Sequence, residues 1–322
     1  ILQGADDYLF IMFVGIIATI FYNLSSNIVR ALGDSKTPLY FLIVSTVLNL
    51  IMDILFVIKF NWGIKGVGWA TIVAQAISTI LCVWYMLIKF PILKLNRNDW
   101  KIPLPFLYEH LRIGIPMGIQ MSVLSLGILA LQYVLNTFGA TAIAAFTTAC
   151  RIEQIFGQLF IALGATMAVY TAQNFGAKKL SRIKEGVKKS IYIALTIYVF
   201  SITFISLFST QMVSLFITET NEELIYLANQ YLYIIMVFFI FLGLLLIFRN
   251  VLQGMGSVMA PLSSGIAELI ARTACAFLFG YFFGYQGVCY ATPMAWIAAA
   301  IVLYAGATSF VESIKKVIHK EV

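Results

Sequence analysis

The sequence has 322 residues, of which 61% are hydrophobic and only 11% are charged, and its mean hydropathy is +0.94. Soluble domains carry about 25% charged residues, so this composition excludes a soluble globular fold, a disordered chain and a coiled coil. The formal net charge of +7 does not indicate a nucleic-acid-binding protein, because the lysines and arginines gather in short loops between apolar stretches. We therefore predict an all-α polytopic membrane protein.

The apolar stretches are long enough to be membrane-spanning helices. A helix that crosses a bilayer needs about 20 predominantly apolar residues. Runs such as Ile234 to Phe248 lack the alternation of polar and apolar residues that is typical of membrane β-barrel strands. Two basic, partly amphipathic segments, 104–112 and 178–190, are expected to be interfacial helices. Nine stretches are predicted to be spans: 8–29, 38–60, 66–88, 113–136, 141–172, 190–211, 224–248, 258–282 and 286–311.

The distribution of basic residues predicts the orientation. One face of the membrane carries the 30–37, 89–112, 174–189 and 249–257 loops and the C-terminus, with seventeen Lys and Arg in total. The other face carries two, Lys59 and Lys65. Basic loops remain in the cytoplasm, so we expect a multi-pass protein of the plasma or inner membrane with a cytoplasmic C-terminus.

The sequence also contains an internal repeat. Six helices separate each element from its copy, so both copies enter the membrane in the same direction, as in transporters with parallel repeats. Residues 5–9 match residues 228–232 at an offset of 223, and Gly33 and Pro38 match Gly256 and Pro261 at the same offset. Residues 63–71 match residues 284–292 at an offset of 221.

The repeat divides the chain into predicted parts. Residues 113–322 form one complete six-helix lobe, residues 1–90 match only the last three helices of that lobe, and residues 91–112 form a cytoplasmic linker with an interfacial helix. We expect that three N-terminal helices of a twelve-helix, two-lobe protein are missing, so that nine of the twelve are present. We expect no transport by these residues alone.

Several short motifs, in this order and spacing, resemble the multidrug and toxic compound extrusion (MATE) family. They are Ala5-x-x-Tyr8-Leu9, Arg30-Ala31-Leu32-Gly33-Asp34-Ser35-Lys36-Thr37-Pro38, Gly114-Ile115-Pro116, Gln173-Asn174-x-Gly176-Ala177 and Gln253-Gly254-x-Gly256. The resemblance implies helices four to twelve of a monomeric antiporter that exports small organic, often cationic, compounds by alternating access. It implies Na⁺ or H⁺ as the coupling ion, contact with membrane lipids, no other cofactor and no nucleic-acid partner.

Asp53 is a candidate for binding the coupling cation. Its helix offers no basic partner within a turn, whereas Asn49 lies one turn earlier on the same face. A sodium ion requires several hard oxygen ligands, and Thr71 on the next helix offers a hydroxyl. The resemblance implies the same three residues as the cation site, together with an aspartate on a first helix that is absent from this sequence. The alternative is a protonated Asp53 that packs between helices.

Glu153 is a candidate for substrate or proton coupling. A charge in the membrane centre costs about 2.5–3.5 kcal/mol, and Arg151 points to another side of the helix. Glu153 is therefore expected either to function in a cavity, as the resemblance implies, or to pair with a residue on another helix. Four further residues are expected to line the same cavity: Gln120, Gln132, Asn136 and Tyr231.

Glu268 and Arg272 are spaced to form an ion pair on one helix face, which we expect either to stabilise the bundle or to act in transport. An enzyme is not expected, because the two histidines lie in cytoplasmic segments and the sequence has no phosphate-binding glycine loop. A channel does not fit the repeat. The alternative function is a flippase of lipid-linked saccharides with the same general fold, since Arg151 and Arg272 could bind a pyrophosphate.

Overall fold

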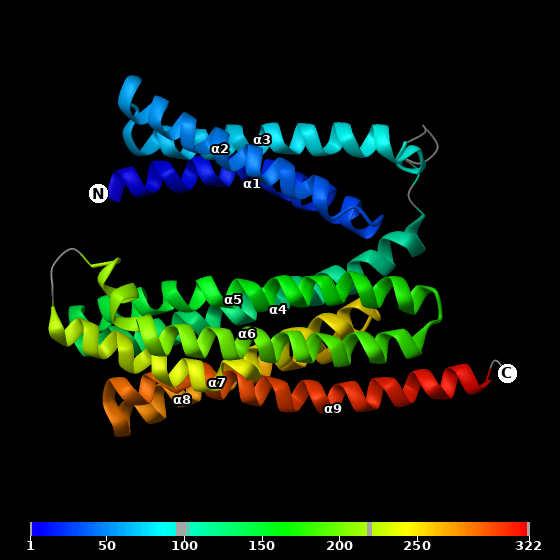
Figure 1. Cartoon of the computed structure of the whole chain (residues 1–322). Coiled ribbons are helices and arrows are strands. Elements are labelled where there is room, and N and C mark those ends of the chain that lie inside the picture. The colour runs from blue at the N-terminus through cyan, green and yellow to red at the C-terminus, as the bar shows by residue number, and fades with distance from the viewer. Residues whose placement is uncertain (1, 95–100, 102, 218–220, 321–322) are drawn as a thin grey trace. The chain divides into compact units, whose positions relative to one another are not determined.

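The structure is a computed structural model that describes residues 2–94, 101, 103–217 and 221–320, with side chains described for 6–94, 101, 103–217 and 221–306. These residues form nine α-helices and no strand, which confirms the all-α prediction (Figure 1). The chain divides into two compact units, Ile1–Ile102 and Pro103–Val322. We call them the first and the second unit and describe each by itself.

The first unit contains α1 (Leu2–Ala31), α2 (Lys36–Ile54) and α3 (Gly63–Lys89). Both α1 and α2 pack on α3. A π-helical turn, Leu55–Lys59, continues α2 to its end. The small core of this unit lies around Tyr22, Val29 and Cys82, where the Tyr22 hydroxyl donates a 3.0 Å hydrogen bond to the carbonyl oxygen of Pro38.

The second unit contains six helices, α4 to α9. They are α4 (Leu104–Leu135), α5 (Gly139–Gly176), α6 (Leu180–Ser214), α7 (Glu222–Gly254), α8 (Met259–Cys289) and α9 (Ala291–Lys320). The central helix α7 packs on α5, α6, α8 and α9, while α8 packs on α4 and α9. The largest buried side chains, among them Phe160, Tyr231 and Phe239, lie where α5 and α7 meet.

Each predicted span corresponds to a helix. Seven helical stretches of the described chain are long and apolar enough to cross a membrane. One of them, Leu104–Gly176, contains both α4 and α5, because the 3₁₀ turn Asn136–Phe138 joins these helices without a break. The described part of α9, Ala291–Gly306, is a shorter apolar helix.

The structure differs from the sequence expectation at the two basic segments. Residues 104–112 are the first turns of α4, and residues 180–190 are the first turns of α6, so neither is a separate interfacial helix. The helices continue from these basic turns into the spans: α4 runs through Gly114 and Pro116, just after the predicted junction, and α6 runs through Gly186. The second unit begins at Pro103, within the predicted linker 91–112, of which residues 95–100 and 102 lie outside the described chain.

The backbone repeats its turns at the positions that the sequence repeat pairs. Gly33 and Gly256 both have positive φ, of 97° and 82°, at the ends of α1 and α7. After each glycine a backbone amide reaches back five residues: Asp34 N–H donates to Val29 O at 3.2 Å, and Ser257 N–H donates to Leu252 O at 2.9 Å. This is the Schellman arrangement that ends many helices.

A second pair of turns also repeats. Gly63 precedes the body of α3 with a φ of 55°, and Gly284 breaks α8 with a φ of 63° and non-helical ψ. The break at Gly284 lies between the predicted spans 258–282 and 286–311, so the sequence located this end of a helix correctly. Glycine reaches such φ values without steric cost, which explains why it occupies all four positions.

Candidate functional site

A cavity of about 410 Å³ lies inside the second unit. Five helices line it: α4, α5, α7, α8 and α9. Its wall is largely apolar, with Phe146, Leu242 and Trp296 among the lining side chains. The polar residues of the wall are Gln132, Thr147, Glu153, Gln154, Gln158, Tyr231, Arg272 and Thr292. Concave, mostly apolar sites with a few convergent polar groups are typical of small-molecule binding.

Glu153 is held in this wall by a tyrosine of the neighbouring helix. The Tyr231 hydroxyl donates a 2.5 Å hydrogen bond to Glu153 Oε2. Tyr231 is only 1% exposed and its ring packs edge-on against Phe146, with ring centres 4.6 Å apart. The Cys150 thiol lies 3.6 Å from the same hydroxyl. Packing on both sides thus fixes the hydroxyl that orients the carboxylate, and one carboxylate oxygen, Oε1, is left for a proton or a ligand.

Three of the five residues predicted for the substrate site come together in this cavity. Gln132, Glu153 and Tyr231 all line it. Asn136, in the turn after α4, accepts a 3.1 Å hydrogen bond from Gln132 Nε2, so it orients a lining residue without belonging to the wall. Gln120 is 1% exposed and accepts a 3.2 Å hydrogen bond from Gln253, outside the cavity.

Glu268 and Arg272 form the ion pair that their spacing predicts, at 2.7 Å. The structure adds a residue that the sequence reading missed, since Arg249 of α7 also pairs with Glu268, at 2.9 Å. All three side chains are buried, with residue exposures of 7%, 5% and 5% for Arg249, Glu268 and Arg272. Arg249 was assigned to the cytoplasmic loop 249–257, and this was wrong, because α7 continues to Gly254.

The four charged residues of this region balance one another. We call Arg249, Glu268 and Arg272 the buried triad; with Glu268 ionised it carries one net positive charge. Glu153 lines the same cavity as Arg272, and an ionised Glu153 would neutralise the remaining charge. Uncompensated charge is costly inside an apolar bundle, so protonation of Glu153, or binding of a cation to it, changes the electrostatic energy of the whole cluster.

The first unit places the three predicted cation-site residues at the contact of α2 and α3. Asn49 Nδ2 donates a 3.4 Å hydrogen bond to Thr71 Oγ1, which itself donates to the Val67 carbonyl oxygen at 3.0 Å. Asp53 lies one turn after Asn49, in the last turn of α2 before the π-helical turn. Its Oδ1 atom is buried and has no hydrogen-bond partner among the described residues. π-turns occur frequently at functional sites.

These three residues offer a carboxylate, an amide and a hydroxyl, all hard oxygen donors that suit Na⁺. An unpartnered buried carboxylate oxygen calls for a physical explanation, and a bound proton, water or ion would each provide one. No group of three or more His, Cys, Asp or Glu side chains that could hold a metal ion occurs in the described part of the chain. The residues at the contact of α2 and α3 that could offer oxygen ligands to a cation are thus Asn49, Asp53 and Thr71.

Comparison with known proteins assigns the family. The family profile MatE matches residues 1–55 and 116–282, which include Asn49, Asp53 and the candidate residues of the second unit but not Thr71. The chain belongs to the MatE family. It is therefore a multi-pass membrane protein of a transporter family, and the resemblance expected from the sequence motifs is confirmed.

Curated relatives of this MatE chain include bacterial proteins with multidrug names. A probable multidrug resistance protein YpnP of Bacillus subtilis (strain 168) is 27% identical over 297 residues, which are 88% of this chain and 63% of that protein. The multidrug export protein MepA of Staphylococcus haemolyticus (strain JCSC1435) is 23% identical, over 91% of this chain and 64% of that protein. The chain thus spans about two thirds of the length of these relatives.

Solved structures confirm the fold of the chain. A crystal structure of MATE in complex with MaL6 superposes with a TM-score of 0.88 at 22% identity, over 96% of this chain and 70% of that one. An outward-facing multidrug resistance MATE family transporter superposes with a TM-score of 0.89 at 21% identity, with the same coverage. At this identity the similarity concerns the fold.

Proposed function

We propose that this MatE chain exports small organic compounds, often cationic ones, across the cell membrane by alternating access and in exchange for Na⁺ or H⁺. The observation that carries the proposal is the cavity in the second unit, where Glu153 lies among apolar and amide side chains. The relatives are named for multidrug resistance and multidrug export, which supports the same substrate class.

The cavity suits compounds that combine a flat apolar body with a positive charge. Its apolar wall and the Tyr231 ring provide dispersion and cation–π contacts, while the free oxygen of Glu153 provides the counter-charge. An organic cation and a proton exclude each other at Glu153, because its carboxylate can bind only one of them at a time. Such competition is the simplest basis for exchange, since each ligand is released when the other binds.

In the first unit we propose that Asn49, Asp53 and Thr71 bind the coupling cation. The unpartnered Asp53 oxygen and the Asn49–Thr71 hydrogen bond support this assignment. Cation binding to Asp53 would remove the cost of an unpaired carboxylate between two apolar helices. Protonation of Asp53 would remove the same cost, so an experiment is needed to distinguish Na⁺ from H⁺ as the coupling ion.

The test uses the whole protein reconstituted in liposomes, with efflux of ethidium driven by a Na⁺ gradient or by a pH gradient. We expect Asp53→Asn to abolish cation-driven efflux and Glu153→Gln to reduce it at least about tenfold, in line with the loss of a charge-assisted contact. Glu222→Gln, at the exposed start of α7, is the matched control and should retain efflux. Cation-driven efflux that survives both Asp53→Asn and Glu153→Gln would refute the proposal.

A second candidate function is the flipping of lipid-linked saccharides. Arg272 in the cavity wall favours it, because a guanidinium binds a pyrophosphate. This guanidinium is already paired with Glu268, however, and Arg151 is exposed on the surface of the second unit. Both arginines are thus less suited to a phosphate in this cavity, and we favour the exporter. Turnover of a lipid-linked sugar by the same liposomes would reverse that choice.

A further inference from the structure

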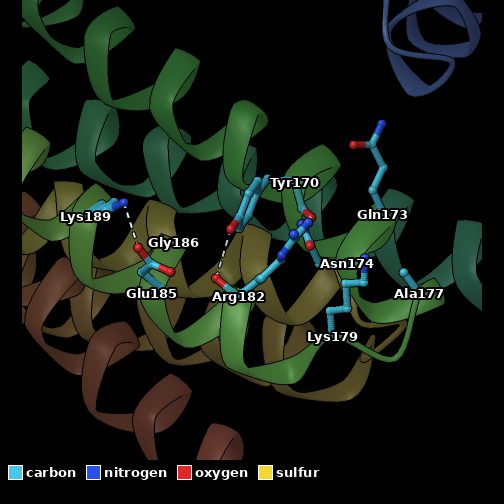
Figure 2. A pocket seen from close by; sticks show the side chains of 9 residues that line it. All are labelled: Tyr170, Gln173, Asn174, Ala177, Lys179, Arg182, Glu185, Gly186 and Lys189. Carbon is cyan, nitrogen blue, oxygen red and sulfur yellow. Dashed lines mark hydrogen bonds and ion pairs between the residues drawn. The ribbon is translucent and has the colours of Figure 1, made fainter.

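A second pocket, of about 520 Å³, lies between the last turns of α5 and the first turns of α6. Figure 2 shows its side chains, which come from the end of α5, the connecting turn and the start of α6. Unlike the cavity around Glu153, its wall is predominantly polar and basic: it includes Asn174, Lys179, Arg182 and Lys189. Transport as proposed above makes no use of it.

The floor of this pocket is built tightly. The Tyr170 hydroxyl donates a 2.9 Å hydrogen bond to the carbonyl oxygen of Arg182, which ties α5 to α6 (Figure 2). The Tyr170 ring lies directly on Gly186, where an added Cβ would come within 2.3 Å of a ring carbon. Only glycine permits this close approach of the two helices. Asn174 donates a 2.8 Å hydrogen bond to the Tyr170 carbonyl oxygen, so the α5 side of the pocket is also held in place.

The connecting turn adds a basic residue to the rim. Lys178 takes a left-handed conformation, with a φ of 58°, and the Lys179 amide donates a 2.8 Å hydrogen bond back to Asn174 O. Helices usually place glycine at such a position. The chain thus ends α5 with a sharp turn that brings Lys179 into the pocket wall beside Arg182.

The pocket carries three cationic side chains and one carboxylate, Glu185. Glu185 pairs with Lys189 at 2.7 Å, which neutralises that side of the wall. Lys179 and Arg182 form no ion pair within the described residues, so two positive charges face the space between them. An arginine fork beside an ammonium group is the arrangement that binds phosphate oxygens in proteins.

The length of α6 places one end of the pocket at the depth of lipid headgroups. The helix has 35 residues, so at about 1.5 Å per residue it is about 52 Å long, whereas the hydrocarbon core of a bilayer is about 30 Å thick. The apolar part of α6 begins near Ser190, so the pocket extends from Lys189, at the edge of the hydrocarbon, to Arg182, about 12 Å beyond it. Basic pockets between helices at this depth are suited to anionic lipid headgroups.

We propose that this pocket binds the phosphate of an anionic phospholipid in the leaflet that the basic loops face, through Lys179 and Arg182. The lipid chains would run along α5 and α6 beside exposed apolar side chains such as Tyr192 and Ile193. This inference does not depend on the transported compound or on the coupling ion.

The experiment measures thermal unfolding of the whole purified protein in detergent, followed by a thiol-reactive dye, in a background where Cys289 is the cysteine kept to report unfolding of the second unit. Dioctanoyl phosphatidylglycerol, dioctanoyl phosphatidylcholine and inorganic phosphate are titrated separately. The pocket variant is Lys179→Gln/Arg182→Gln. The matched control is Lys184→Gln/Lys188→Gln, which removes the same charge from exposed residues of the same turns outside the pocket wall.

Phosphatidylglycerol is expected to raise the unfolding temperature with a saturable dependence, because a ligand stabilises the state that binds it. The pocket variant should bind it at least about tenfold more weakly, since two charge-assisted contacts are lost, while the control should stay within about twofold. Arg182→Gln alone should give an intermediate loss, and it replaces the double variant if that variant does not fold.

Three results would overturn the proposal. Equal stabilisation by phosphatidylcholine would show that headgroup charge is not recognised. Equal stabilisation by inorganic phosphate would identify a site for free anions. An equal loss in the pocket variant and the control, or no loss in either, would show a diffuse attraction between a basic surface and anionic lipid in place of a site.

Discussion

Replacement of Glu268 by glutamine is the sharpest test of how the second unit is held together. Glu268 accepts ion pairs from Arg249 on α7 and from Arg272 on its own helix, and all three side chains are almost fully buried. Glu268→Gln keeps the size of the side chain but leaves two guanidinium groups facing each other inside an apolar bundle. The neutral amide keeps one acceptor oxygen for one arginine, and its NH2 group, which only donates, faces the other arginine.

The cost follows from the number of charges left without a partner. Removing one partner of a buried ion pair costs about 3–5 kcal/mol, because the remaining charge is desolvated and uncompensated. Here one substitution affects two pairs, so the upper part of that range applies. Since about 1 kcal/mol shifts the unfolding temperature by about 2–4 °C in a domain of this size, we expect a decrease of roughly 10–20 °C.

The protein contains cysteines suited to the measurement. Cys289 is buried in the second unit and Cys82 in the first, so each reports the unfolding of its own unit to a thiol-reactive dye. In a background where Cys82, Cys150 and Cys275 are replaced by alanine, the dye signal comes from Cys289. Arg249→Met/Glu268→Leu/Arg272→Met is the matched variant, because replacing all three charges by apolar side chains is often neutral for stability.

Exposed ion pairs contribute less than about 1 kcal/mol to the free energy of unfolding. A loss of that size for Glu268→Gln would show that the triad does not behave as a buried charge cluster. An equal loss in the triple variant would do so as well, since the argument predicts that uncompensated charge, and not the absence of the ion pairs, is costly. Glu153→Gln serves as a contrast: it leaves both ion pairs of the triad intact, so it should lower stability less than Glu268→Gln does while it reduces transport.

Two further predictions concern the loops. Asp34 accepts hydrogen bonds from the Tyr85 hydroxyl at 2.6 Å and from the first amides of α2, and the Tyr85 bond above all lowers the pKa of Asp34 to about 2. The contribution of Asp34 to the free energy of unfolding is thus complete above about pH 4 and is lost as the pH falls through 2. At neutral pH, Asp34→Ala should lower the free energy of unfolding by about 1 kcal/mol, measured through the exposure of Cys82. For the topology, a cysteine at Asn61 should react with an impermeant thiol reagent outside intact cells, whereas labelling of one at Ala177 would refute the orientation.

The positions of the helices could be predicted from the sequence because hydrocarbon thickness imposes a length on each apolar run. Every predicted span has its helix, and the break between the last two spans falls at Gly284. What could not be predicted is how far a helix continues beyond the membrane. The basic turns 104–112 and 180–190 are helical extensions of α4 and α6, and neither Gly114 and Pro116 in α4 nor Gly186 in α6 ends its helix.

The chemistry of the site could be predicted in part. An ionisable residue in an apolar run indicates that it needs a partner, and this argument found Asp53, Glu153, Glu268 and Arg272. It does not tell which residue on another helix supplies the partner, since that depends on helix rotation and register. Arg249 was missed for this reason: it lies near the end of an apolar run, where it resembles a loop residue, and only the contact of α7 with α8 places it against Glu268.

The repeat shows which features the fold requires and which the function adds. Both copies keep the turn glycines, Gly33 and Gly256, with left-handed φ and matching hydrogen bonds. They do not keep the carboxylate, because Asp53 corresponds to the fully buried Ala276 at an offset of 223. The carboxylate is therefore not among the features that the two copies share, which is consistent with a role in binding.

This reasoning predicts that the paired glycines contribute equally to their two units. An added Cβ would meet no atom within 4 Å at Gly33 or Gly256, so alanine there costs only backbone strain, about 1–2 kcal/mol. Gly33→Ala should lower the stability reported by Cys82, and Gly256→Ala that reported by Cys289, by this same amount. Gly118→Ala, in open space on a helical part of α4, should instead stabilise by about 0.5–1 kcal/mol, since alanine lowers the entropy of the unfolded chain. If Gly118→Ala lowered the free energy of unfolding as much as the two turn substitutions do, the loss would not come from the left-handed turns. The expectation that these turns stabilise both units would then be wrong.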